Sequence, residues 1–225
     1  MTTSSLDPIA RRALEFVSHG AAVGLGTGRA ASAFIESLGE RVRQGLRVRA
    51  VPTSEGSASL ARTLGIPLVD LSAVEFLDVT VDGADEVDPQ CQVIKGYGGA
   101  LLREKIVAAA SRKFVILVGP EKLVPMLGTR GKVPVEVVPF GVPLAMRWLQ
   151  QLGYDPRIRQ HEGEPFRTDN NNHVIDCHVQ PLTQPKRLQE ELQTIPGVVG
   201  TGLFLDMVDL VLIQHPDRIE ERQRM

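Results

Sequence analysis

The sequence predicts an α/β protein, in which a doubly wound, mostly parallel sheet of Rossmann-like type carries an inserted, smaller α+β domain of ferredoxin-like type. Short apolar strands alternate with helical segments as far as Lys122, which is the pattern of a parallel sheet covered by helices. A glycine turn, Gly26-Thr27-Gly28, joins the first strand to a helix. Beyond Lys122 the order of elements changes, and this change predicts the second domain.

The first domain is expected to span residues 1–130 and 206–225. Its strands are predicted from short apolar runs and its helices from apolar residues at helical spacing. The run Phe114–Val118 is apolar throughout, so it predicts a central parallel strand. Gly39 is expected to end the second helix. The expected helices are 6–17, 30–38, 53–64 and 101–110, and the expected strands are 21–25, 48–51, 66–69, 74–81, 93–94, 114–118 and 210–213.

The second domain is expected to span residues 131–205. The order strand, helix, strand, strand, helix, strand, with one extra hairpin strand, is typical of a ferredoxin-like domain. Its expected strands are 133–138, 157–159, 166–168, 173–179 and 198–205, and its expected helices are 142–152 and 186–194. The charged tail from Asp217 to Met225 is expected to be solvated.

The composition argues against several classes of protein. A net charge of −2 and an aromatic content of 4% disfavour a nucleic-acid binder. No apolar run approaches the ~20 residues that span a bilayer, and the N-terminus lacks the pattern of a signal peptide. The isolated Cys91 and Cys177 favour a reducing, cytoplasmic setting, and the five scattered histidines lack metal-ligand spacing. We therefore expect no metal site, no membrane partner and no nucleic-acid partner.

The residues most typical of a catalytic site lie between Asp78 and Lys105. Asp82 opens a run of four acids in seven residues, Lys95 begins a glycine-rich loop, and the helix that follows carries Glu104. Ligands of open α/β sheets bind where strand ends meet helix N-termini, so this stretch favours a site for a small polar molecule. Two alternatives stay open: the acids could form a solvated turn, and Glu104 could be an exposed helix charge. The spacing of a calcium loop is absent.

The first glycine turn also has to be tested as a dinucleotide site. Gly26, Gly28 and Ala31 satisfy the pattern G-x-G-x-x-A. A dinucleotide site also needs an acid at the tip of the second strand, which would bind the ribose hydroxyls. That strand instead ends in Pro52-Thr53-Ser54, so a dehydrogenase is disfavoured.

The stretch VDGADEVD at 81–88, followed by KGYGGALLREKIV at 95–107, resembles the motifs of the type A ribose-5-phosphate isomerases. The resemblance extends over most of the chain. Further segments occur in the order found in that family: GLGTG at 24–28, PVEVVPF at 134–140, TDN at 168–170 and IPGVVGTGLF at 195–204.

The resemblance implies an aldose–ketose isomerase that works without a cofactor, and it implies a role for each matching residue. Glu104 matches the family's proton-abstracting glutamate, and Lys95 matches the lysine that stabilises the developing oxyanion. Asp82 and Asp85 match aspartates that contact the sugar hydroxyls and assist ring opening. Residues matching substrate-binding positions are Thr27, Gly28, Arg29, Ala30, Gly83, Ala84, Gly96, Tyr97, Gly98 and Lys122.

Two positions depart from the family pattern. Arg29 and Ala30 stand where the family usually has serine and threonine, so two hydroxyls expected near the phosphate are missing. We expect the Arg29 guanidinium to bind the phosphate in their place, the alternative being that backbone amides suffice. Tyr97 replaces a glycine that is common in the lysine loop.

The resulting hypothesis is a cytoplasmic enzyme that interconverts D-ribose 5-phosphate and D-ribulose 5-phosphate, in the pentose phosphate pathway. The resemblance also implies a homodimer or homotetramer. Two alternatives are an isomerase of a related sugar phosphate and a non-catalytic sugar-phosphate sensor. The presence of all four candidate catalytic side chains argues against the sensor.

Overall fold

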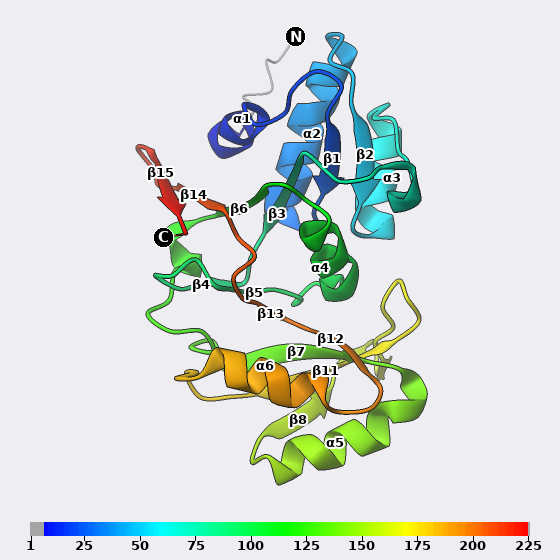
Figure 1. The fold of residues 1–225 in the computed structure, drawn as a ribbon, viewed down its shortest axis with the longest axis vertical. Coiled ribbons are helices and arrows are strands. Elements are labelled where there is room, and N and C mark those ends of the chain that lie inside the picture. Colours follow the sequence, from blue (N-terminus) through cyan, green and yellow to red (C-terminus); the bar gives the residue numbers. More distant parts are fainter. Residues whose placement is uncertain (1–6, 225) are drawn as a thin grey trace. The chain divides into compact units, whose positions relative to one another are not determined.

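The computed structural model describes residues 7–224 and divides the chain into two compact units, whose elements are labelled in Figure 1. The first unit comprises the described chain up to Gly83, the segment Ile106–Glu121 and the chain from Met207 onward. The second unit comprises Ala84–Lys105 and Lys122–Asp206. Each unit has its own hydrophobic core.

The first unit contains a six-stranded sheet in the order β15-β14-β6-β3-β1-β2. The five strands from β14 to β2 are parallel, and β15 is antiparallel to β14. This confirms the predicted mostly parallel sheet. The strands are β1 (Ala22–Leu25), β2 (Arg49–Pro52), β3 (Val79–Gly83), β6 (Phe114–Val118), β14 (Leu210–Gln214) and β15 (Ile219–Gln223).

Alternation along the strands sends side chains to both faces of this sheet. Val23 and Val81 pack on one face with Phe34 and Leu38 of α2, in the main core of the unit. Ala22 lies in a smaller cluster with Val107 of α4. The helical elements of the chain up to Lys122 are α1 (Pro8–Leu14), α2 (Arg29–Arg43), α3 (Glu55–Thr63), α4 (Leu101–Ala109) and the short turns η1 (Leu71–Ala73) and η2 (Pro120–Lys122).

The second unit contains a four-stranded antiparallel sheet in the order β12-β7-β11-β8. With its two helices it follows the chain order β-α-β-β-α-β, which confirms the predicted ferredoxin-like pattern. Its elements are β7 (Lys132–Val137), η3 (Pro139–Gly141), α5 (Val142–Gln151), β8 (Asp155–Ile158), β11 (His173–His178), α6 (Pro185–Gln193) and β12 (Val198–Thr201).

Two smaller sheets complete the second unit. One is three-stranded, in the order β13-β5-β4, and joins β4 (Glu86–Val87), β5 (Val93–Ile94) and β13 (Leu203–Phe204). The other is a hairpin of β9 (Gln160–His161) and β10 (Glu164–Pro165). The extra hairpin strand was expected at 166–168, where the structure has only the bridge Arg167 to His173; the β9–β10 hairpin and the break between β12 and β13 were not expected.

Several expected elements differ in the structure. The helix expected to end at Gly39 continues to Arg43, because Gly39 faces Leu64 so closely that a Cβ would lie 2.8 Å from the Leu64 Cβ. The expected strand at 66–69 makes only a single bridge, Ala50 to Leu68. The C-terminal tail is not merely solvated, because Ile219–Gln223 pairs with β14. Of the expected N-terminal helix, Leu6 lies outside the described residues.

The limits of the two compact units differ from the expected domain limits. The expected domains were residues 1–130 with 206–225, and residues 131–205. Residues 84–105 group with the second unit, because β5 pairs with β13 and the Lys95 N–H donates to the Gly202 carbonyl at 2.9 Å. These bonds join segments that are more than a hundred residues apart in the sequence. The proton-transfer candidates Lys95 and Glu104 therefore share one unit with the ferredoxin-like sheet.

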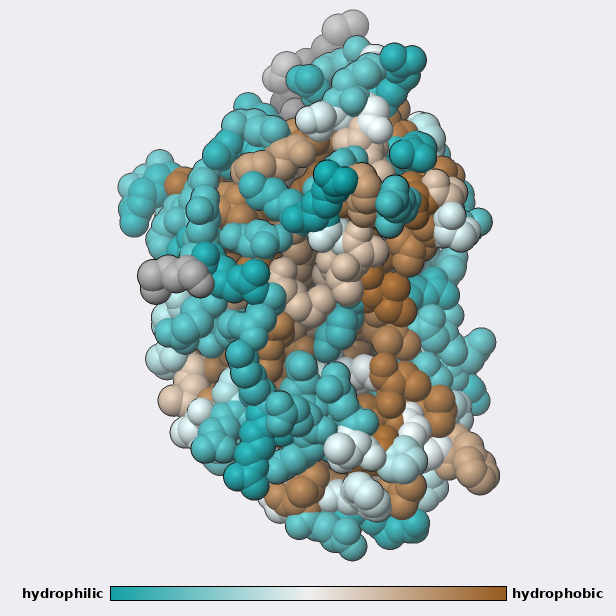
Figure 2. Space-filling model, in the orientation of Figure 1, coloured by the Kyte–Doolittle hydropathy of each residue, from teal (hydrophilic) through white to brown (hydrophobic). Residues whose placement is uncertain are grey.

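The face of the protein shown in Figure 2 is largely hydrophilic, with hydrophobic residues exposed in places. Phe140, in η3, is 99% exposed. No helix within residues 7–224 is both long and apolar enough to span a membrane.

Candidate active site

Lys95 and Glu104 form a buried ion pair in the second unit. Lys95 directly follows β5, and Glu104 lies in the first turn of α4. The Lys95 Nζ lies 3.4 Å from the Glu104 Oε2, and the two residues are 2% and 4% exposed. The alternative that Glu104 is an exposed helix charge is therefore wrong. The pair places a proton-accepting group beside a fixed positive charge, in surroundings that strengthen electrostatic interactions.

Asp85 forms hydrogen bonds to the loop that carries Lys95 and to the strand that precedes it. Its Oδ2 accepts a hydrogen bond from the Tyr97 N–H at 2.9 Å, and its own N–H donates to the Ile94 carbonyl at 2.8 Å. Asp85 and the preceding Ala84 are half-buried. Within the second unit the structure thus pairs Asp85 with Tyr97 and Lys95 with Glu104.

The side chain of Tyr97 takes part in packing and not in acid–base chemistry. Its ring joins the edge of the second unit's core, and its hydroxyl donates to the Lys132 carbonyl at 3.4 Å. Burial, followed by the charges of Glu86 and Asp85, raises the pKa of Tyr97 well above its ordinary value. The glycine-to-tyrosine departure therefore adds packing under the loop and leaves Gly96, Gly98 and Gly99 in place.

Asp82 is the next-to-last residue of the first unit's strand β3 and is fully buried. Its Oδ1 accepts hydrogen bonds from the Thr27 N–H at 3.0 Å and from the Gly83 N–H at 2.7 Å. Gly26 makes this approach possible, because a Cβ there would lie 2.2 Å from the Asp82 carboxyl carbon. The glycine turn after β1 and the acidic turn after β3 are thus joined through one carboxylate.

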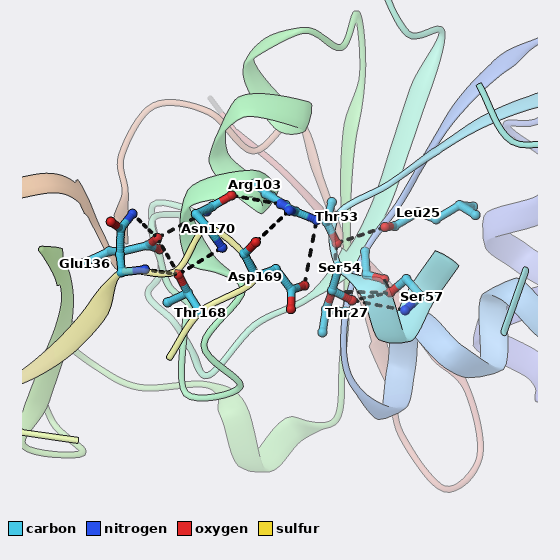
Figure 3. Close-up of polar contacts among 12 residues, drawn as sticks. Leu25, Thr27, Thr53, Ser54, Ser57, Arg103, Glu136, Thr168, Asp169 and Asn170 are labelled. Atoms are coloured by element: carbon cyan, nitrogen blue, oxygen red, sulfur yellow. Dashed lines mark hydrogen bonds and ion pairs between the residues drawn. The ribbon is translucent and has the colours of Figure 1, made fainter. Parts of the chain in front are cut away.

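The Thr27 side chain is the centre of a hydroxyl network (Figure 3). Its Oγ1 lies 2.8 Å from both the Thr53 Oγ1 and the Ser54 Oγ. The Ser57 hydroxyl donates to the Gly26 carbonyl at 2.5 Å, and the Thr53 hydroxyl donates to the Leu25 carbonyl at 2.9 Å. This network fixes the glycine turn. Sequence reasoning missed these three residues, although the hydroxyl-rich run after β2 was a signal.

The remaining candidates of the first unit surround the start of α2. Gly28 is the N-cap residue, with a φ of 100°, and no side chain caps the helix. Gly28 and Arg29 are exposed, and Ala30 is half-buried. The helix begins at Arg29, so the free N–H groups of its first turn and its dipole favour an anion there.

Lys122 ends η2 and is half-buried. Gly83 and Lys122 lie at positions where the chain passes between the two units, since Gly83 is the last residue of one segment and Lys122 the first of another. Within residues 7–224 the structure brings no three histidine, cysteine, aspartate or glutamate side chains together in a way that could hold a metal ion.

Comparison with known proteins identifies the family. The model of the ribose 5-phosphate isomerase A family (phosphoriboisomerase A) matches residues 49–218, which is most of the chain. The chain belongs to this family. It is 50% identical to the ribose-5-phosphate isomerase A of Roseiflexus castenholzii over 215 residues, covering 94% of this chain and 92% of that protein. The corresponding protein of Gloeobacter violaceus is 47% identical over 212 residues, with the same coverage of each chain.

Solved structures of the isomerase family have the same fold. The ribose 5-phosphate isomerase A of Methanocaldococcus jannaschii superposes with a TM-score of 0.90 at 37% identity, covering 96% of each chain. A structure of D-ribose-5-phosphate isomerase in complex with phospho-erythronic acid superposes with a TM-score of 0.91 at 36% identity and the same coverage. The isomerase of Plasmodium falciparum gives a TM-score of 0.92 at 34% identity, again over 96% of each chain.

Sequence reasoning on this isomerase missed a polar chain that links Glu136 to Arg103, the residue before Glu104 in the sequence (Figure 3). Glu136 of β7 is fully buried, and its Oε1 accepts hydrogen bonds from the Thr168 hydroxyl at 2.9 Å and the Asn170 amide at 3.2 Å. The Arg103 Nε donates to the Asn170 Oδ1 at 2.9 Å, and its Nη2 donates to the Asp169 carbonyl at 2.9 Å. The segments PVEVVPF and TDN were noticed only as motifs, yet they anchor the residue next to Glu104.

Proposed function

We infer that this chain is an isomerase that interconverts D-ribose 5-phosphate and D-ribulose 5-phosphate. Its membership of the ribose 5-phosphate isomerase A family supports the reaction. The observation that carries the chemistry is the buried pair of Lys95 and Glu104, 3.4 Å apart. The interconversion places the chain in the non-oxidative pentose phosphate pathway.

The proposed reaction moves one proton between neighbouring carbons of the open-chain sugar. The Glu104 carboxylate removes the proton from C2 of the aldose, and the electron pair forms an enediolate whose negative charge lies on the C1 oxygen. The Lys95 ammonium stabilises that oxyanion. The C2 hydroxyl proton then passes to the C1 oxygen, and Glu104 returns its proton to C1 as the electron pair on the C2 oxygen forms the C2 carbonyl. Every atom of the aldose is kept in the ketose.

Ring opening precedes this step, and we assign it to the aspartates. Asp82 and Asp85 are proposed to contact the sugar hydroxyls and to move the proton between the anomeric hydroxyl and the ring oxygen. Asp82 accepts two backbone hydrogen bonds through its Oδ1, so its orientation is fixed. Asp85 is fixed by the Tyr97 N–H.

The substrate phosphate is proposed to bind at the start of α2. Thr27, Gly28, Arg29 and Ala30 would supply backbone N–H groups, the helix dipole and one guanidinium. Gly83, Ala84, Gly96, Tyr97, Gly98 and Lys122 are proposed as the other substrate-binding residues. The exposed position of Arg29 leaves its guanidinium able to reach an anion in solvent.

We further propose that the enzyme works in the cytoplasm as a homodimer or homotetramer. The resemblance to the family supports the assembly, and the fully exposed ring of Phe140 is an apolar group that such an assembly could bury. Light scattering coupled to size-exclusion chromatography measures the assembly directly, and a monomeric mass would contradict this proposal.

The test of the proposed function is the formation of ribulose 5-phosphate from ribose 5-phosphate in the presence of EDTA. The scheme uses only side chains and backbone dipoles, so turnover should persist after exhaustive chelation. Binding of ribose 5-phosphate without turnover would indicate a sensor instead. Activity that EDTA abolishes and a divalent ion restores would contradict the metal-free mechanism.

A further inference from the structure

The loop that carries Lys95 needs outside contacts to keep one conformation. Three of the five residues from Lys95 to Gly99 are glycines, and Gly96 and Gly99 have φ values of 104° and 86°. Because glycine residues allow the backbone many conformations, a loop this rich in glycine keeps one conformation only if neighbouring residues form bonds to it. The Lys95 N–H and the Tyr97 N–H already have partners, in the Gly202 carbonyl and Asp85.

Two carbonyl groups of the loop accept hydrogen bonds from the side chain of Arg159, and one of them, that of Gly96, also accepts the Gly99 N–H at 3.0 Å. The Arg159 Nη1 donates to the Gly96 carbonyl at 2.8 Å and to the Tyr97 carbonyl at 3.0 Å. Arg159 follows β8 in the sequence, and its N–H donates to the Val174 carbonyl of β11 at 2.8 Å. The four-stranded sheet therefore reaches the backbone carbonyls of the lysine loop through the guanidinium of Arg159.

The other edge of the guanidinium is fixed by Asp176. The Arg159 Nη2 lies 2.5 Å from the Asp176 Oδ1, and its Nε donates to the Oδ2 at 3.2 Å. Lys132 also pairs with Asp176, at 3.1 Å, and its Nζ lies 4.6 Å from the centroid of the Tyr97 ring. Burial raises the pKa of Asp176, but the hydrogen bonds and charges of Arg159 and Lys132 outweigh it and hold that pKa below its ordinary value.

This arrangement differs from an ordinary surface ion pair. The side chains of Arg159 and Asp176 are 11% and 12% exposed, and the fork of the guanidinium is used on both edges. A lysine could pair with Asp176 but could not bridge the carboxylate and two carbonyls in a plane. Pairing with Asp176 alone would not require an arginine. An arginine is required at this position only if its hydrogen bonds to the Gly96 and Tyr97 carbonyls are needed as well.

We propose that Arg159 is a positioning residue for the isomerisation, which holds the Gly96 and Tyr97 carbonyls so that the Lys95 ammonium stays beside Glu104. This inference rests on the proposed role of Lys95. Arg159 acts through the loop and takes no part in the proton transfer. Its loss should therefore lower the rate of the chemical step more than the binding of the substrate.

The first test compares Arg159→Met, Arg159→Lys and the control Arg157→Met. Arg157 lies two residues away on β8, is 68% exposed in its side chain and pairs with Asp155. We expect Arg159→Met to lower kcat by roughly 10- to 100-fold, since a misplacement of about 1 Å can cost about 100-fold, with KM changed by less than about 3-fold. Arg157→Met should leave both constants unchanged.

Arg159→Lys separates positioning from folding. It keeps the charge beside Asp176, so its melting temperature should stay near that of the parent, while its kcat still falls. A purely structural role predicts the opposite, that the lysine variant restores kcat together with stability. Full activity of Arg159→Lys would therefore overturn the inference.

A double-mutant cycle with Lys95→Ala tests the connection to Lys95. If Arg159 acts through Lys95, then Arg159→Met should lower kcat by less than about 3-fold further in the Lys95→Ala background. If Arg159→Met lowered kcat equally in the parent and in the Lys95→Ala background, the inference would be overturned. It would also be overturned if the parent converted ribose 5-phosphate and Lys95→Ala kept full activity.

Hydrogen exchange tests the contact independently of turnover, so failure here can be told apart from failure of the proposed function. The amides of residues 96–99 should exchange faster in Arg159→Met, while amides of β7 and β11 keep their protection. Unchanged exchange in the loop would overturn the inference whatever the activity.

Discussion

Lys105 is the residue after Glu104, yet its ammonium group has a separate set of partners. It donates to the Thr201 and Leu203 carbonyls, each at 2.7 Å, and lies 4.7 Å from the centroid of the Phe204 ring. These contacts fasten the start of α4 to the strand segment that follows Gly200. Burial lowers the pKa of Lys105 to about 8, because removal from water disfavours the charged ammonium.

This shift predicts a specific dependence of stability on pH. The folded protein releases the Lys105 proton near pH 8, whereas the unfolded chain keeps it up to the ordinary value of 10.5. The unfolded state binds more protons in this interval, so the free energy of unfolding should rise between pH 8 and 10.5, by up to about 3 kcal/mol. Urea unfolding of the parent and of Lys105→Met measures this contribution as the difference between their pH profiles. Parallel profiles would contradict the shifted pKa.

Arg29 stands where the motif of the family predicts a hydroxyl side chain, and it is predicted to anchor the phosphate. A charge-assisted hydrogen bond contributes ~1.5–3 kcal/mol, and ~1.4 kcal/mol corresponds to a tenfold change in affinity. Arg29→Ala should therefore raise KM for ribose 5-phosphate by roughly 10- to 150-fold, with little effect on unphosphorylated ribose. Steady-state kinetics with both substrates measure this.

The matched control is Arg43→Ala, which removes an exposed arginine from the last turn of the same helix. It should leave KM unchanged. An equal loss on ribose and ribose 5-phosphate in Arg29→Ala would mean that the substitution had disturbed the loop rather than a phosphate contact.

At the scale of elements, the sequence predicted best where local pattern and tertiary environment agree. The apolar run Phe114–Val118 is β6 with the same bounds, and the helix carrying Glu104 begins at Leu101 as expected. The predictions were wrong where contacts between segments far apart in the sequence determine the structure. Gly39 lies inside α2 and packs closely on Leu64 instead of ending the helix, and the tail forms β15 because it pairs with the edge of β14.

The lysine loop provides a prediction at this scale, because two adjacent glycines differ in their surroundings. At Gly99 the φ is 86° and a Cβ would lie 2.4 Å from the Phe166 ring, whereas at Gly98 nothing lies within 4 Å. Left-handed strain costs roughly 1–2 kcal/mol and overpacking roughly 1–3 kcal/mol. Gly99→Ala should thus lower the free energy of unfolding by at least about 2 kcal/mol.

Gly98→Ala is the control for this stability measurement. Its free energy of unfolding should stay within about 0.5 kcal/mol of the parent's, as for substitutions without a strained backbone or a clash. Equal destabilisation by the two alanines in urea titrations would contradict the distinct environments of these glycines.

At the scale of the whole molecule, the two compact units share the candidate residues between them. Thr27, Asp82 and Arg29 belong to the first unit, and Asp85, Lys95 and Glu104 belong to the second. The residues that the sequence predicted lie in short contiguous motifs, in which residue type alone suggests chemistry. The supporting residues, such as Thr53, Asn170 and Arg159, come from distant segments that only the fold brings to the motifs, so their contacts could not be predicted even where, as at Thr53 and Asn170, a local pattern was visible.

The central claim is that Glu104 is the base of an isomerase, and the measurement that tests it most directly is the turnover of ribose 5-phosphate by Glu104→Gln. The amide keeps the size of the side chain but cannot accept the proton, so kcat should fall by roughly 10²- to 10⁴-fold. Calorimetric binding of ribose 5-phosphate should be retained, and Glu164→Gln, an exposed substitution in β10, should behave as the parent. A Glu104→Gln variant that turns over within a few-fold of the parent would contradict the account.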